Sequence, residues 1–103
     1  MSMNKDMYPL MSTFYKLKIK TDVKSINNWN KIIEKNAKEK GLETSEVISN
    51  IIDKLCKLSE FNNKRLLNET YKFVANTCMN EEKYLDVNEF LNSIIKKAGN
   101  SNV

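Results

Sequence analysis

The hydrophobic pattern along the chain changes its period once, next to Asp22. Before this point, residues 15–20 read YKLKIK, in which apolar residues alternate with lysines. Such alternation is typical of a β-strand with one apolar and one cationic face. After it, apolar residues recur at helical spacing, with one break at Gly41. The pattern therefore predicts a mainly α-helical protein, in which a short N-terminal strand over residues 14–20 is followed by four helices.

Capping and turn residues locate the four predicted helices. Asp22 can accept hydrogen bonds from the free amides of a first helical turn, and Gly41 fits the left-handed position at a helix end. Asp86 and Glu89 have the spacing of a capping box. We predict helices over about residues 23–40, 44–58, 62–79 and 87–98.

The two ends of the chain lack this pattern. Residues 1–13 are predicted to be an N-terminal arm, because Pro9 disfavours a helix there. Residues 14–99 are predicted to form a single domain, in which residues 59–99 are a helical extension. Residues 100–103 are predicted to be a disordered tail.

The predicted strand needs a partner, since a lone strand leaves its backbone N–H and C=O groups unpaired. The simplest partner is the same strand of a second copy, which predicts a homodimer. Dimerisation would also enlarge the modest core that a chain of 103 residues can bury. The lysines of the paired strands would then form one cationic surface. The alternative is an edge strand whose lysines only discourage aggregation.

Composition narrows the range of functions. A net charge of +4 fits a nucleic-acid partner, but it is equally common as an aid to solubility. The chain has no histidine, two cysteines and two glycines. The usual zinc sites, histidine-dependent catalysis and glycine-rich phosphate loops therefore lack the residues that build them. We expect no enzyme activity, no metal and no cofactor.

Composition also bears on localisation. No apolar run is long enough to span a membrane, and no signal peptide is visible. Cys56 and Cys78 stand beside apolar neighbours in helical patterns, which predicts buried, reduced thiols. We therefore expect a cytoplasmic protein that has no membrane partner.

The segment from Phe14 to Leu58 resembles the ribbon-helix-helix family of DNA-binding proteins. Members of this family have a strand, a helix, a turn in which an apolar residue follows a glycine, and a second helix that opens with a Ser-Glu-apolar-apolar step. Residues 41–48, GLETSEVI, contain this turn and this step. Ala37 and Ile33 stand four and eight residues before the glycine, as in the family pattern.

The resemblance implies a dimer whose two strands pair antiparallel and enter the major groove of duplex DNA. Tyr15, Leu17 and Ile19 would then face the dimer core. The amides near the start of the second helix would hold a phosphate. The residues implied in DNA binding are Lys16, Lys18, Lys20, Lys24, Thr44 and Ser45.

Together, these features predict a dimeric, sequence-specific, duplex-DNA-binding protein. The abundance of Asn, Lys and Ile indicates the AT-rich genome of a bacterium, plasmid or phage, in which such proteins act as transcriptional repressors, partition factors or accessories of the conjugation relaxosome. Lysines favour salt-dependent contacts with phosphates over discrimination between bases. The helices after residue 58 would extend the dimer core or dock another protein.

Two alternatives use the C-terminal half differently. In a winged helix-turn-helix protein, residues 70–87 would form a hairpin, because their apolar residues also alternate acceptably. Residues 79–94 resemble the second half of an EF-hand, but Cys78 and Lys83 stand where calcium binding needs an acid and a glycine. This second alternative is a non-catalytic, metal-free helical module that binds another protein.

Overall fold

A computed structural model describes residues 5–77 and 83–100 of the protein. They form a 3-10 turn, η1 (Lys5–Met7), and five α-helices: α1 (Tyr8–Lys16), α2 (Val23–Lys40), α3 (Thr44–Ser59), α4 (Lys64–Thr77) and α5 (Val87–Asn100). The mainly α-helical class is confirmed, and the described residues contain no strand.

Residues 14–20 do not form the predicted strand, because α1 extends to Lys16 and a turn follows it. The spacing that decides this structure begins further upstream, where apolar side chains recur at helical intervals. Three of these side chains are fully buried: Met7, Leu10 and Phe14. The alternation arises because the chain leaves the helix and then turns Ile19 back into the core, where it is 5% exposed. The described chain therefore offers no strand for an intermolecular ribbon.

The predicted N-terminal arm is also corrected, from Lys5 onward. Residues 5–16 pack against α3 and belong to the core of the single chain. Pro9 lies in the first turn of α1, where the N–H that proline lacks would have no helical partner. The Thr13 hydroxyl donates a hydrogen bond to the Pro9 carbonyl at 2.9 Å. Proline thus begins this helix instead of preventing it.

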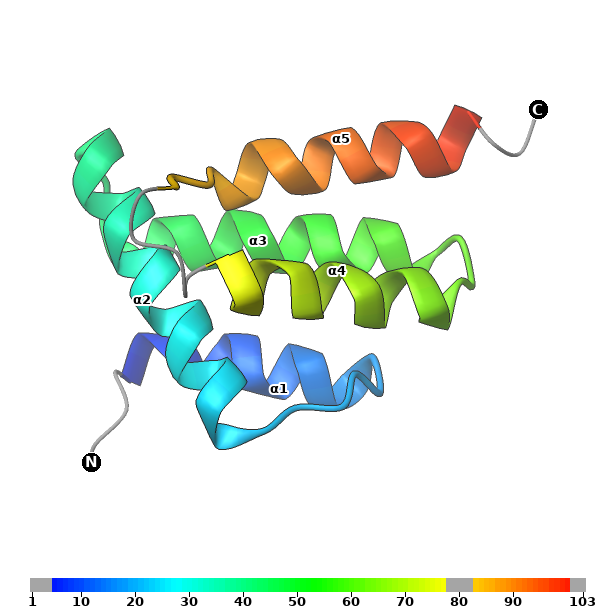
Figure 1. Ribbon diagram of the computed structural model, residues 1–103, viewed down its shortest axis with the longest axis horizontal. Helices are drawn as coiled ribbons and strands as arrows, with labels where there is room; N and C mark the ends of the chain where they lie inside the picture. Colours follow the sequence, from blue (N-terminus) through cyan, green and yellow to red (C-terminus); the bar gives the residue numbers. More distant parts are fainter. Residues whose placement is uncertain (1–4, 78–82, 101–103) are drawn as a thin grey trace.

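α3 lies at the centre of the molecule, between α1 on one side and α5 on the other (Figure 1). α2 runs across one end of this layer and packs against both α3 and α4. Because α1 and α5 are separated by α3, the two helices present different surfaces to solvent.

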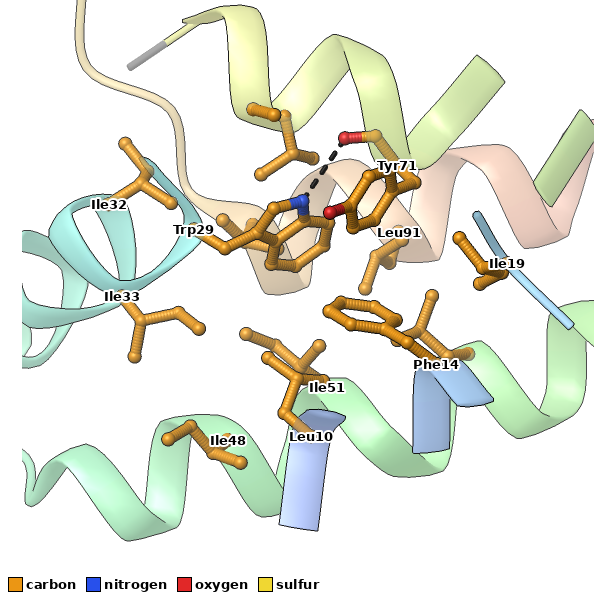
Figure 2. Packing of buried hydrophobic residues seen from close by; sticks show 14 of the residues in the cluster. Leu10, Phe14, Ile19, Trp29, Ile32, Ile33, Ile48, Ile51, Tyr71 and Leu91 are labelled. Atoms are coloured by element: carbon orange, nitrogen blue, oxygen red, sulfur yellow. Dashed lines mark hydrogen bonds between the residues drawn. The ribbon is translucent and has the colours of Figure 1, made fainter. Parts of the chain in front are cut away.

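An aromatic cluster joins α1, α2 and α4 in the core (Figure 2). The ring of Phe14 lies 5.2 Å from that of Trp29 and 4.9 Å from that of Tyr71, both edge to face. The indole N–H of Trp29 donates to the Tyr71 carbonyl at 3.1 Å, which satisfies a buried donor. Ile19 belongs to the same core, so the turn after α1 is fixed to it.

The first two predicted helices are confirmed as α2 and α3. The Asp22 carboxylate accepts a hydrogen bond from the Ser25 N–H at 2.8 Å and caps α2. Gly41 ends α2 in the left-handed conformation, at φ 66°. α2 and α3 are thus two helices joined at a glycine turn, as the capping residues predict.

The C-terminal predictions have mixed outcomes. Residues 64–77 are helical, so the first strand of the winged alternative is wrong. Residues 83–86 form no strand and α5 begins at Val87, so the second half of that hairpin is wrong as well. Residues 78–82, which would complete the hairpin and the calcium-type loop, lie outside the described residues. So does the predicted tail, apart from Asn100, which ends α5. Cys56 is exposed, which corrects the expectation that it would be buried.

A polar clamp fixes the start of α5 to α2. Asp86 caps α5 by accepting from the Glu89 N–H at 3.1 Å, as predicted, and also pairs with Lys40 at 2.6 Å. The fully buried Asn36 donates to the Leu85 carbonyl and accepts from the Val87 N–H, both at 2.8 Å. Both ends of its amide are thereby satisfied, as a buried polar group requires.

Candidate nucleic-acid interface

Four predicted lysines gather at the turn between α1 and α2. Lys16, Lys18, Lys20 and Lys24 are all exposed, and the first three line an open hollow together with Tyr15 and Ile19. Lys16, Lys18 and Lys20 form no ion pair with any residue in the described ranges. Their charges are therefore available to a ligand.

The turn itself holds Lys18 in a strained backbone conformation. Lys18 has φ 58°, in the left-handed region that costs an L-residue about 1–2 kcal/mol. The conformation is imposed by two hydrogen bonds that close the end of α1: the Lys18 N–H donates to the Tyr15 carbonyl at 3.1 Å, and the Ile19 N–H to the Phe14 carbonyl at 2.9 Å. This is a Schellman motif, in which the left-handed position is usually glycine.

The cationic surface continues from the turn onto α4. The Lys20 N–H donates to the side-chain oxygen of Asn68 at 3.3 Å, and the Asn68 amide is oriented by a hydrogen bond to the Lys64 carbonyl at 2.9 Å. Lys64 and Lys72, both exposed, stand one helical turn before and after Asn68 and so share its face of α4. We call Lys16, Lys18, Lys20, Lys24, Lys64 and Lys72 the basic face.

The beginning of α2 packs against the same part of α4. Burial raises the pKa of the Tyr71 hydroxyl, which lies near Ser25 and Asp22. Hydrogen bonds from the Ser25 N–H and hydroxyl lower the pKa of Asp22, which keeps this carboxylate charged. Asp22 is therefore one negative charge at the edge of the basic face, and its capping role explains its presence there.

Charge is distributed unevenly between the elements. Residues 16–40 and 64–77 carry eleven lysines and arginines against four acids, whereas residues 41–63 carry two lysines against four acids. Eleven cations minus four acids give residues 16–40 and 64–77 a combined net charge of +7, which exceeds the +4 of the whole chain. Residues 41–63, with two cations and four acids, have a net charge of −2. When charge is separated in this way, electrostatic attraction steers the basic part of a protein toward a polyanion.

 

The structure does not bring Thr44 and Ser45 to the basic face. Ser45 lines a different hollow with Lys5 and Pro9, near the start of α1, whereas the basic face lies at the end of that helix. Nine helical residues separate the two places by about 13 Å. Glu43 and Glu46 also flank this end of α3 with negative charge. The predicted phosphate site at α3 and the predicted lysines are therefore two separate places.

The residues expected to face a dimer core have three different environments. Ile19 is buried in the core of its own chain, Leu17 is half-buried, and Tyr15 is 86% exposed. Because Ile19 is already used within one chain, strand pairing no longer supports a homodimer, which stays a prediction.

Sequence reasoning missed the contribution of α4 to this surface. Lys64 and Lys72 are eight residues apart and exposed, a spacing that marks one side of a helix. Nothing in the spacing shows that this side meets the turn after α1. The contact between Lys20 and Asn68, which are 48 residues apart in sequence, is what joins them.

No known protein family, curated protein or solved structure matches this chain. None of the helices in the described part is both long and apolar enough to cross a membrane. Within the same residues, no three acidic or cysteine side chains gather as a metal ion would require.

Proposed function

We propose that the protein binds duplex DNA through the basic face, mainly by contacts with phosphates. The observation that carries this proposal is Lys18. A lysine occupies the left-handed position of a turn, where glycine would be less strained, and its neighbours Lys16 and Lys20 are also exposed and unpaired among the described residues. A strained residue that folding does not need is a reasonable sign of function.

The mode of binding differs from the one that the sequence suggests. Without a ribbon, no pair of strands enters the major groove, and lysines on a turn and two helix surfaces reach phosphates more readily than base edges. Affinity should then depend steeply on salt and weakly on sequence. Sequence selectivity, and a role as repressor, partition factor or relaxosome accessory, stay predictions.

The test compares two double variants that remove the same charge from different surfaces. Lys16→Gln with Lys20→Gln changes the basic face and leaves the backbone at Lys18 untouched. Lys96→Gln with Lys97→Gln changes exposed lysines on α5, on the other side of α3 (Figure 1). Binding to a short fluorescent duplex is measured by anisotropy between about 50 and 200 mM salt.

We expect the first variant to bind more weakly and to flatten the salt dependence by roughly two units of slope, because each lost phosphate contact removes about 0.9. The α5 variant should bind with nearly the wild-type slope. Equal losses of DNA affinity in the two variants would show that binding depends on the net charge of the protein and not on the basic face. Absence of wild-type binding at the lowest salt would remove the proposal altogether.

A further inference from the structure

We infer that Tyr15 gives the basic face a preference for DNA that contains unpaired bases, by stacking on a base while the lysines hold the adjacent phosphates. This inference rests on the proposed function and narrows its substrate to duplexes with gaps or other single-stranded positions.

Tyr15 is an aromatic ring presented to solvent on a rigid support. It is 86% exposed, the most exposed large apolar side chain among the described residues. The residue before it, Phe14, is fully buried in the aromatic cluster, and the Tyr15 carbonyl accepts the Lys18 N–H at 3.1 Å. The backbone that carries the ring is therefore fixed on both sides.

The surroundings of the ring match a nucleotide strand. Tyr15 lines one hollow together with Lys16, Lys18, Ile19 and Lys20, so an aromatic residue and three lysines border the same space. Single-stranded nucleic acids are bound by this combination, in which positive charge follows the backbone and aromatic rings stack on bases. In an intact duplex the bases are already stacked on each other, so the ring has no base face to cover.

A second tyrosine on the same helix offers a matched control. Tyr8 is 57% exposed and stands seven residues before Tyr15. Its nearest charged neighbours in sequence are Lys5 and Asp6, whose charges are opposite. Tyr8 thus provides an exposed ring on α1 that is not part of the basic face.

The experiment measures the ratio of affinities for two probes of the same sequence, one an intact duplex and the other a duplex with a short single-stranded gap. The wild type should favour the gapped probe. Tyr15→Leu should reduce this ratio about five-fold or more, the range that loss of one stacked base produces. Tyr15→Phe should keep the preference, because its ring also stacks, and Tyr8→Leu should keep it as well.

The outcomes separate this inference from the proposed function. If Tyr15→Leu leaves the ratio unchanged while the lysine variants still weaken duplex binding, the role of Tyr15 is wrong and the DNA proposal stands. If Tyr15→Leu weakens both probes equally, or if Tyr8→Leu has the same effect, base stacking by Tyr15 is also wrong. If no probe binds the wild type, the proposed function itself fails.

Discussion

The turns that end α1 and α2 have the same hydrogen-bonding pattern but differ in the residue at the left-handed position. That residue is Lys18 in the first turn, at φ 58°, and Gly41 in the second, at φ 66°. In each turn the following amide donates to the carbonyl five residues before it, at 2.9 Å. Glycine adopts this conformation without strain, whereas lysine does not. The first turn therefore places a charge at its tip at some cost to stability, and the second does not.

The lysines beside the two turns also differ in what they contact. Lys40, next to Gly41, pairs with Asp86 at 2.6 Å and helps to hold α5. Lys16 and Lys20, on either side of Lys18, have no acidic partner among the described residues. One turn thus uses its cation within the fold, while the other leaves its cations for a partner.

The two turns should differ most in how much stability is lost when the apolar residue after the left-handed position is truncated. Ile19 is 5% exposed in the core, whereas Leu42 is 39% exposed. Ile19→Ala should lower the free energy of unfolding by about 2–4 kcal/mol, because it leaves a cavity beside the aromatic cluster. Leu42→Ala should lower it by less than about 1 kcal/mol. Urea unfolding of the two variants checks this, and equal losses would mean that the first turn is not docked as described.

The same two turns show which parts of the fold the sequence predicts. α2 and its end were predictable because Asp22 and Gly41 are local signals with a direct physical meaning. The end of α1 was not, because a lysine at the left-handed position gives no such signal. Over six residues, the alternation in YKLKIK has the same period whether the chain is a strand or leaves a helix through a turn.

The candidate site was predictable only in part, for a related reason. The lysines from Lys16 to Lys24 are close in sequence, so their gathering needs no tertiary information. Their union with Lys64 and Lys72 depends on how α4 packs, through Asn68 and Lys20. The separation of Ser45 from these lysines follows from the direction of α1. The helical spacing of Met7, Leu10 and Phe14 indicates this helix, but Pro9, read from the sequence alone, argues against it.

An intermediate effect on stability is expected from removing the Asp86 carboxylate, which pairs with Lys40 beside the second turn. Burial alone would raise the pKa of Asp86, but hydrogen bonds from Lys40 and from the Glu89 N–H outweigh it and hold the pKa below 3.8. Because the pKa is lower in the folded state, the stabilisation is present above about pH 4 and is lost as the pH falls through the folded value. Asp86→Asn should therefore cost about 1 kcal/mol at neutral pH and progressively less in acid.

The control for this pH dependence is a lysine beside the other turn. Lys40→Met should lose the same acid-sensitive contribution as Asp86→Asn, and the double variant should lose little more than either single one. Lys16→Met, which removes a cation without a described partner, should leave both the stability and its pH dependence nearly unchanged. Urea unfolding at several pH values measures all four variants, and an acid-independent gap for Asp86→Asn would contradict the ion pair.

The smallest expected effect on stability is the one that tests the comparison most directly, because the two turns should respond with opposite signs. Gly41→Ala should destabilise by about 1 kcal/mol, purely through its backbone, since a Cβ there would meet nothing within 4 Å. Lys18→Gly should stabilise the fold by about 0.5–1 kcal/mol, because relief of strain exceeds the added freedom of the unfolded chain.

The same Lys18→Gly variant should bind duplex DNA more weakly, since it loses a cation at the tip of the basic face. A variant that is more stable but binds less well is the result expected where function has displaced the best residue for folding. Loss of stability would show that Lys18 is not strained, and unchanged affinity would show that its charge does not reach the DNA.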